Sequence, residues 1–440
     1  MEINELKGIL REYGVVGAGG AGFPTYAKLD QKADTIILNC AECEPLLKLH
    51  RQVLERYAKE ILHTLDLIAK TVGAKNVYVA VKRSYRKTIE AVSPILSFFD
   101  NIKICELREI YPAGDEVILT YEVTGRVVPP GSIPLSVGVT VLNVETVYNA
   151  YRALNSLPVT YKFVTIAGAV NKPVTVQAPI GVKIKDIMPL TGGVTIDDPA
   201  YFIGGPMMGR IGSESDIVTK TTNAVLILPS DHQIIKKKQS KTFINMKRAM
   251  AACCQCNYCT TLCPRNLLGH PIDPAEFMRV ASNGITNEAG PYINSLYCCS
   301  CGLCEMYSCG QGLSPRTLLD NCKGVLRQNG LKPTPIEAGP VYEERSKRQV
   351  PMARLMARLG LNAYNKTAPI IDTPVKAERV SILLSQHIGA PSVPTVNVGD
   401  KVKENQLVAK PAEGLGVGIH SPINGVVKAV GKKAIIIVAD

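Results

Sequence analysis

Ten of the fourteen cysteines in this 440-residue chain fall in two short runs. The first, Cys253–Cys263, has the spacing C-x-x-C-x-x-C-x-x-x-C and is followed by Pro264; the second, Cys298–Cys309, repeats it with one extra residue. This is the spacing of bacterial [4Fe–4S] sites, because three thiolates on one tight loop reach three corners of a cubane while the fourth arrives from elsewhere. The sequence therefore predicts two [4Fe–4S] clusters and electron-transfer chemistry.

The ligand sets follow from the pattern of two-cluster proteins, in which the fourth cysteine of each run binds the cluster of the other run. The expected ligands are Cys253, Cys256, Cys259 and Cys309 for cluster one, and Cys298, Cys301, Cys304 and Cys263 for cluster two. Cys254 and Cys299 would break the three-residue step, so we expect them to be packed thiols beside the clusters. Two tetrahedral zinc sites are the alternative, because paired C-x-x-C motifs also suit Zn²⁺.

The remaining cysteines carry a weaker signal. Cys40 and Cys43 form a C-x-x-C pair, but we expect both to be small buried hydrophobic residues, and Cys105 and Cys322 to be singletons. Clustered cysteines in a long chain that opens with an acidic segment favour metal ligands over disulfides, and no apolar run is long enough for a transmembrane segment. These features predict a cytoplasmic protein.

The net charge of +12 raises the question of nucleic-acid binding, and its densest basic stretch lies between Lys236 and Arg248. No basic helix interleaved with stacking aromatics accompanies it, and tryptophan is absent, so we expect no nucleic-acid partner. Two anionic clusters and the phosphates of nucleotide cofactors would offset much of this charge. No constellation typical of a protease, glycosidase or kinase occurs, and no catalytic side chain is predicted.

The predicted elements indicate an α/β protein of several domains. From residue 35 to about 155, strands (35–39, 77–81, 102–106, 138–144) alternate with helices (50–72, 85–99), as in a parallel sheet. Short strands at 163–168, 174–177 and 182–184 and a helical turn at 186–190 then predict a β-grasp-like domain. Helices are expected at 244–253, 274–282 and 315–329. The expected domains are a Rossmann-like domain (1–158), a β-grasp-like domain (159–235), a helical two-cluster ferredoxin-like domain (236–335), a linker (336–377) and a lipoyl-like barrel-sandwich module (378–440).

A glycine-rich loop near the N-terminus matches G-x-G-x-x-G through Gly17, Gly19 and Gly22, and Glu42 lies twenty residues beyond it. Residues 6–13 read as a helix rather than a strand, and a Phe-Pro pair stands where a helix should follow, so the strand–loop–helix context of the dinucleotide fingerprint is missing. A loop whose backbone N–H groups approach a phosphate or a flavin remains the prediction.

Four motifs in order, at 17–25, 39–45, 111–116 and 141–146, resemble the flavin and NADH signatures of the NADH-binding flavoprotein subunit of respiratory complex I. The resemblance implies FMN and NADH as cofactors. The cofactor-binding residues that it implies are Gly17, Gly19, Gly20, Gly22, Lys28, Asn39, Glu42, Tyr111, Gly114, Glu116, Asn143 and Thr146, with Phe23 and Glu44 at the nicotinamide nucleotide.

The order of parts resembles the RnfC component of Rnf electron-transport complexes, in which the lipoyl-like module usually comes first. Here it comes last, as in the cobalamin reductases of propanediol-utilisation microcompartments, which the chain resembles over nearly its whole length, including 202–209, 262–265 and 386–390. This implies electron flow from NADH through FMN and two [4Fe–4S] clusters to an acceptor, foremost cob(III)alamin or cob(II)alamin in a coenzyme-B12-dependent pathway. The implied partners are an adenosyltransferase or a microcompartment shell protein, and the location is the cytoplasm or a bacterial microcompartment.

Two alternatives stay open: an electron-relay subunit of an Rnf-type complex without turnover of its own, and a proline-reductase-associated electron carrier. The module's hairpin tip, 413–415, lacks a lysine, so we expect a structural or docking module rather than a swinging carrier. None of the six histidines lies in a D-x-H-x-x-G context, which predicts that cobalamin is a transient substrate or is presented by a protein partner.

Overall fold

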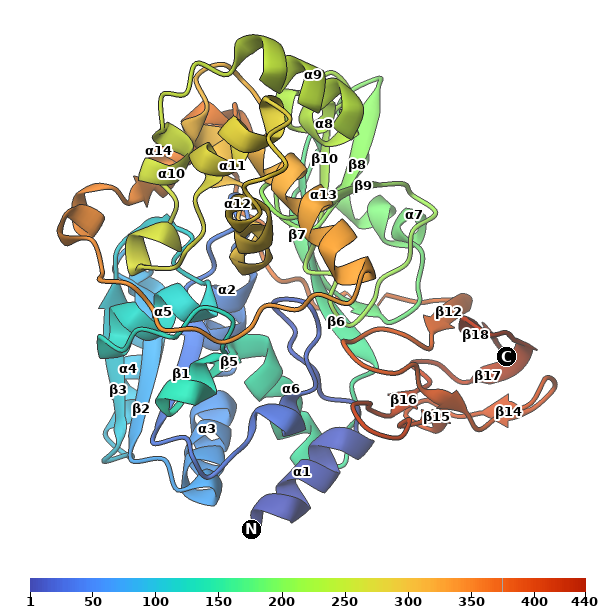
Figure 1. Cartoon of the computed structure of the whole chain (residues 1–440). Coiled ribbons are helices and arrows are strands. Elements are labelled where there is room, and N and C mark those ends of the chain that lie inside the picture. Colours follow the sequence, from blue (N-terminus) through green and yellow to red (C-terminus); the bar gives the residue numbers. More distant parts are fainter. Residues whose placement is uncertain (374) are drawn as a thin grey trace.

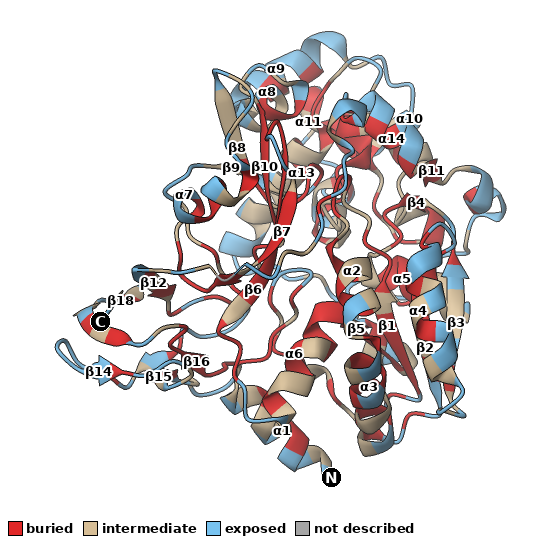
Figure 2. Ribbon diagram, turned by 180° about the vertical axis from the view of Figure 1, so that it is seen from behind, coloured by how far each residue is buried: buried red, intermediate tan, exposed pale blue. Residues whose placement is uncertain are grey.

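A four-stranded parallel sheet forms the centre of the N-terminal domain, in the order β3-β2-β1-β5. Its strands are β1 (Thr35–Cys40), β2 (Asn76–Lys82), β3 (Ile102–Leu107) and β5 (Val139–Asn143). The computed structural model describes residues 1–373 and 375–440; Pro374, in the expected linker, lies outside the described residues. The strands are apolar on both faces because helices cover both sides, as is usual for parallel sheets. Figure 2 shows these strands buried between their covering helices.

Helices on one face of the sheet pack their apolar sides against Ile36, Leu38 and Val79. They are α1 (Ile3–Glu12), α2 (Leu49–Arg56), α3 (Ala58–Val72), α4 (Arg86–Leu96) and α6 (Val144–Leu154). On the other face, Leu119 of α5 (Glu116–Thr124) packs with Ile37.

The single helix expected over 50–72 is wrong, because Tyr57 interrupts it with a non-helical backbone (φ −124°, ψ 34°). Its ring stacks on Tyr148 with centroids 4.2 Å apart. The break lets α2 contact α4 while α3 packs along α6.

The second domain is a five-stranded mixed sheet in the order β7-β6-β10-β8-β9. Its strands are β6 (Tyr161–Gly168), β7 (Val174–Pro179), β8 (Pro199–Ile203), β9 (Arg210–Gly212) and β10 (Ala224–Pro229). The strand expected at 182–184 is wrong: only a bridge between Lys183 and Ile217 occurs there, and α7 (Ile184–Ile187) begins at once. Ile184, Ile187 and Met188 are buried at the helical spacing i, i+3, i+4, which a three-residue alternation cannot reveal.

The cysteine-rich domain is helical and lies above the parallel sheet in Figure 1. Its helices are α8 (Gln233–Gln239), α9 (Thr242–Ala252), α10 (Tyr258–Thr261), α11 (Pro274–Ser282), α12 (Gly290–Asn294) and α13 (Pro315–Gln328). The three helices expected here occur within two residues of their predicted ends. The expected linker 336–377 differs from a simple tether: β11 (Val350–Pro351) pairs with β4 (Ile110–Tyr111), and α14 (Met352–Arg358) packs into a central core.

The C-terminal module comprises two small sheets, β12-β18-β17-β14 and β13-β15-β16. Its strands are β12 (Arg379–Leu383), β13 (Val393–Pro394), β14 (Lys401–Val402), β15 (Leu407–Lys410), β16 (Ile419–His420), β17 (Gly425–Val430) and β18 (Ala434–Ala439). At the hairpin tip, the carbonyl of Gly414 accepts a hydrogen bond from Tyr26 Oη (3.2 Å), so the tip is docked on the first domain. Among the described residues, no helix has the length and apolar character needed to cross a bilayer.

Candidate functional site

The site lies where the strand order of the parallel sheet reverses. β1 pairs with β2 on one side and with β5 on the other, and Asn39 and Asn143 are partners at their carboxyl ends. Ligands of open α/β sheets bind in the crevice at such a switch point. The glycine loop reaches this crevice because Gly17 N–H bonds the Phe23 carbonyl (2.9 Å) and Ala18 N–H bonds Thr146 Oγ1 (2.9 Å).

A cavity of about 330 Å³ opens between the glycine loop and these strand ends. Every predicted cofactor-binding residue except Glu42 lines it. These residues are Gly17, Gly19, Gly20, Gly22, Phe23, Lys28, Asn39, Glu44, Tyr111, Gly114, Glu116, Asn143 and Thr146. The four motifs, far apart in the sequence, thus converge on one cavity.

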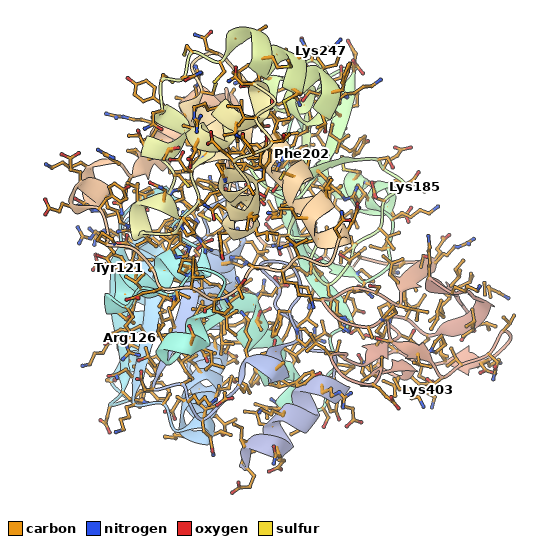
Figure 3. The ribbon with its side chains drawn as sticks, in the orientation of Figure 1. Tyr121, Arg126, Lys185, Phe202, Lys247 and Lys403 are labelled. Carbon is orange, nitrogen blue, oxygen red and sulfur yellow. The ribbon has the colours of Figure 1, made fainter. Side chains whose placement is uncertain are left out.

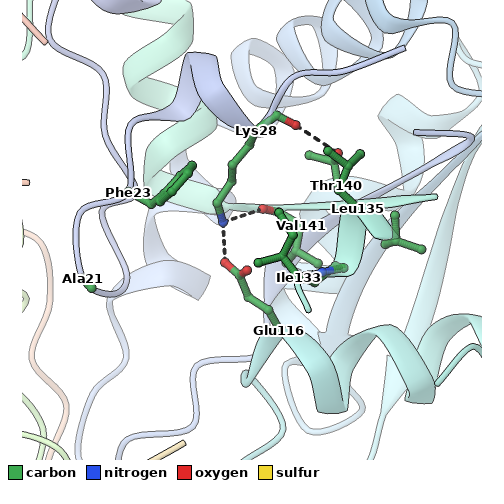
Figure 4. A pocket seen from close by; sticks show the side chains of 10 residues that line it. Ala21, Phe23, Lys28, Glu116, Ile133, Leu135, Thr140 and Val141 are labelled. Atoms are coloured by element: carbon green, nitrogen blue, oxygen red, sulfur yellow. Dashed lines mark hydrogen bonds and ion pairs between the residues drawn. The ribbon is translucent and has the colours of Figure 1, made fainter. Parts of the chain in front are cut away.

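A second, mainly apolar cavity of about 250 Å³ adjoins the first and shares Phe23, Lys28 and Glu116 with it. Figure 4 shows the Lys28 ammonium between the Glu116 carboxylate (Nζ–Oε1 2.5 Å) and the Val141 carbonyl (3.3 Å). Ile133 and Leu135 supply apolar walls. A charged pair at the mouth of an apolar cavity suits an amphipathic ligand such as a nucleotide.

Two helix N-termini meet the larger cavity. Asp115 caps α5 by accepting hydrogen bonds from the N–H groups of Val117 and Ile118, and Asn143 caps α6 by accepting one from Glu145 N–H. The N-terminal ends of helices attract anions through their free N–H groups and dipoles. The cavity therefore suits a phosphate-bearing group.

Close approach within the protein explains two of the glycines. A Cβ on Gly19 would lie 2.5 Å from Asn143 Nδ2, and one on Gly114 would lie 2.7 Å from the Ala41 carbonyl oxygen. Gly20, by contrast, has no atom within 4 Å of a built Cβ. The loop is thus pressed against the strand ends while its middle stays free, as a backbone cradle for a flavin phosphate or ring requires.

The two acidic residues of the 39–45 segment have different surroundings. Glu42 lies outside the cavity lining: one carboxylate oxygen accepts His50 N–H (3.2 Å), and the other is buried without a hydrogen-bond partner. Burial raises the pKa of Glu42 to about 7. Glu44 lines the cavity, and its carboxylate accepts N–H bonds from Met207 (2.8 Å) and Met208 (2.9 Å), which attach the β8–β9 loop to the first domain. Burial also raises the pKa of Glu44.

The cysteines gather in two groups that mix the two runs. The first group lines one cavity and comprises Cys253, Cys254, Cys256, Cys259 and Cys309. The second lines another and comprises Cys263, Cys298, Cys299, Cys301 and Cys304. Each run therefore sends its last cysteine to the other group, as the expected ligand sets require.

These groups suit clusters rather than ordinary thiol packing. Ser300 N–H bonds Cys298 Sγ, and Leu313 N–H bonds Cys309 Sγ, both at 3.3 Å, and such bonds stabilise cluster thiolates. Among the described residues, no three His, Cys, Asp or Glu side chains lie close enough to share one metal ion. A cubane does not need that closeness, because each thiolate binds a different iron.

Cys299 and Cys301 line both the flavin-sized cavity and the second cysteine cavity. Tyr111, which lines the former, donates its hydroxyl to the Cys301 carbonyl (2.6 Å). Across the same junction Arg265 Nη2 contacts both carboxylate oxygens of Asp115 (2.9 and 2.8 Å). Arg265 lines the cysteine cavity and its Nε is buried without a partner, so it offers a donor to an anionic group there.

Sequence reasoning missed several of these residues. Cys43, expected to be a plain buried residue, lines the flavin-sized cavity, as do Asp115 and Met208. Asp115 stands inside a quoted motif and could have been found there. Nothing in the sequence indicates that Arg265, 150 residues away, is its partner.

Family comparisons identify the same parts. Residues 10–152 match the Nuo51 FMN-binding domain, 163–211 an SLBB domain, 252–314 a 4Fe-4S dicluster domain, and 361–439 the RnfC barrel sandwich hybrid domain. The first and third matches imply FMN and two [4Fe–4S] clusters. They confirm the mixed α/β architecture expected from the sequence.

Two curated relatives and one solved structure are similar to the chain. Cobalamin reductase PduS of Salmonella typhimurium is 39% identical over 442 residues, covering 100% of this chain and 97% of that protein. The RnfC-type component of the Na⁺-translocating ferredoxin:NAD⁺ oxidoreductase complex of Acetobacterium woodii is 31% identical over 284 residues, covering 63% and 61%. A crystal structure of the NAD⁺-reducing [NiFe]-hydrogenase in the H₂-reduced state shares the fold, with a TM-score of 0.51, 18% identity, and coverage of 79% of this chain and 66% of that one.

Proposed function

Because this chain belongs to the family of the PduS cobalamin reductases, we propose that it is an oxidoreductase that takes electrons from NADH and delivers them, one at a time, for the reduction of cobalamin. A flavin bound in the larger cavity supplies the conversion of a two-electron hydride into single electrons. The residues of the chain position the nucleotide, exclude water and set the distances between the redox sites.

The observation that carries the proposal is the common wall of two sites. Cys299 and Cys301 separate the flavin-sized cavity from the second cysteine cavity. The first cysteine group shares no lining residue with the flavin-sized cavity. We therefore assign the order of transfer as flavin site, cluster two, cluster one, acceptor.

The proposed entry of NADH is the apolar cavity beside the glycine loop. Phe23 lines both cavities, so its ring is available to a nucleotide that reaches the flavin from that side. Lys28 stands at the shared mouth, where its ammonium can approach a phosphate. The partly exposed Glu116 would then exchange its contact with Lys28 for one with the ligand.

The test is a single-turnover and steady-state experiment on the anaerobically reconstituted protein. Mixing with NADH should reduce the flavin first and the clusters afterwards, and addition of cob(III)alamin should then give multiple turnovers. A protein whose clusters are reduced by dithionite but never by NADH would contradict the proposal. Cluster reduction by NADH without turnover with cobalamin would favour the electron-relay role instead.

A further inference from the structure

The first cysteine group lies at the surface, beside an unusual helix. Cys254 and Cys256 are exposed, whereas Cys301 and Cys304 of the second group are buried. α9 ends at Ala252, so its last turn leads directly into Cys253. Whatever receives electrons from cluster one must approach the protein over this part of the surface.

The outer side of α9 is apolar and basic. Phe243, Lys247 and Met250 follow the spacing i, i+4, i+7 and share this side, while Asn245 and Ala249 face the core. The exposed fractions of Phe243 and Met250 are 65% and 64%. Lys247 Nζ lies 4.5 Å from the centroid of the Phe243 ring. Ile244 and Arg248 on the helix, and Tyr258 in the cluster-one loop, extend this surface, which we call the α9 face.

The charge around the α9 face has one sign. Residues 232–272 contain seven lysines and arginines and neither aspartate nor glutamate. Lys237 and Lys238 of this set are engaged with backbone carbonyls (for Lys237 Nζ, Leu313 O at 2.9 Å; for Lys238 Nζ, Met207 O at 3.0 Å), but Lys241, Lys247 and Arg248 are exposed. An apolar centre with a basic rim is the complement of a protein surface with an apolar centre and an acidic rim.

We propose that the α9 face is the docking surface for an acidic redox protein, which receives electrons one at a time at cluster one. An exposed helix side cannot enclose a small molecule, whereas Phe, Tyr, Met and Arg are the residue types enriched at protein interfaces. The inference rests on the proposed function only in its order of transfer, and cobalamin would be reduced on or beyond this partner. The balance is NADH + 2 acceptor(ox) → NAD⁺ + H⁺ + 2 acceptor(red).

The test uses an acidic rubredoxin as the probe, with basic cytochrome c as its opposite. The full-length protein with its clusters is reduced by dithionite, freed of excess reductant and mixed with either oxidised protein in a stopped-flow instrument, so neither NADH nor cobalamin is needed. The variant Lys247→Glu/Arg248→Glu reverses the α9 face. Lys185→Glu/Lys403→Glu makes the same change in net charge at exposed positions well away from α9 (Figure 3).

We expect the α9 variant to lower the second-order rate constant with rubredoxin about tenfold or more at low salt and to raise that with cytochrome c, because rim charges act mainly on association. The control variant should change either rate by less than about twofold, and added salt should bring wild type and α9 variant together. Equal effects of the two variants, a salt-independent rate, or no transfer to rubredoxin from reduced wild type would overturn the proposal. Failure of NADH to reduce the clusters would contradict the proposed function and leave this test intact.

Discussion

Replacing Arg265 should change the reduction potential of cluster two. The guanidinium lines the second cysteine cavity, has a buried and unpartnered Nε, and is held by Asp115. A positive charge beside a cluster favours the reduced, more negative state, so Arg265→Gln should lower the potential. Asp115→Asn removes the opposing negative charge and should raise it.

The magnitude follows from Coulomb's law. A unit charge about 6 Å from the added electron, at an effective dielectric constant of about 20, interacts by roughly 3 kcal/mol. For a one-electron couple this corresponds to about 120 mV as an upper bound, since 59 mV accompanies each tenfold change. Asp115 opposes Arg265 at 2.8 Å, so wild type feels a dipole, and each single substitution should produce a shift of several tens of millivolts.

The assay is a redox titration of the purified protein followed by EPR. Arg265→Lys keeps the charge and should remain close to wild type, which separates an electrostatic effect from damage to packing. Arg279→Gln removes an arginine whose partner is Glu288 on the surface (2.8 Å) and should leave the potential unchanged. Shifts of the same sign in Arg265→Gln and Asp115→Asn would refute the reasoning.

Three further predictions concern the cofactors and pH. The anaerobic protein should contain about eight irons and eight sulphides; Cys253→Ala should lose one cluster and Cys254→Ala neither, and the reverse pattern in iron content or EPR would show that the ligand register is wrong. Gly19→Val should abolish flavin binding and cluster reduction by NADH but not by dithionite, because its Cβ would lie 2.5 Å from a neighbouring side chain; Gly8→Val, with no atom within 4 Å of the new Cβ, is the control, and flavin retained by Gly19→Val would contradict the cradle. Burial raises the pKa of Glu42 from 4.5 to about 7, so its contribution to stability is full below pH 4.5 and is lost as the pH rises through 7. Urea unfolding between pH 5 and 8 should show this loss, at most about 3 kcal/mol, and Glu42→Gln should remove it; an equal slope in the variant would contradict the assignment.

Local patterns allowed much of the fold to be predicted from the sequence. The strands of the parallel sheet are buried on both faces and read as apolar runs, so β1 to β3 and β5 were found within about one residue at each end. The break at Tyr57 was not, because its cause is a ring stacked on Tyr148, ninety-one positions further along the chain. The strands β8, β9 and β10 were missed because their pairing is set by neighbours in the sheet rather than by their own alternation.

The site was predictable where a motif carries its own chemistry. Cysteine spacing predicts two sites, and the glycine loop predicts a close backbone approach. The junction between the sites was not predictable, since it brings Tyr111 to Cys301 and Asp115 to Arg265 across domains. Electron transfer depends on this junction, so the sequence indicates the redox groups but not the order in which they are connected.

The position of the barrel-sandwich module at the end of the chain has a structural explanation. Gly418 N–H bonds the Arg11 carbonyl of α1 (2.9 Å), and Ile388 N–H bonds the Gly22 carbonyl of the glycine loop (3.3 Å). Lys220 of the second domain is buried between them and donates to the carbonyls of Gly14 (2.7 Å) and Gly418 (3.1 Å). The module is therefore held by contacts with the first helix and the loop, not by the covalent link that precedes it. A module docked beside α1 can be joined to either end of the chain without losing these contacts, which accounts for its place after the cluster domain here and before the flavin domain in RnfC proteins.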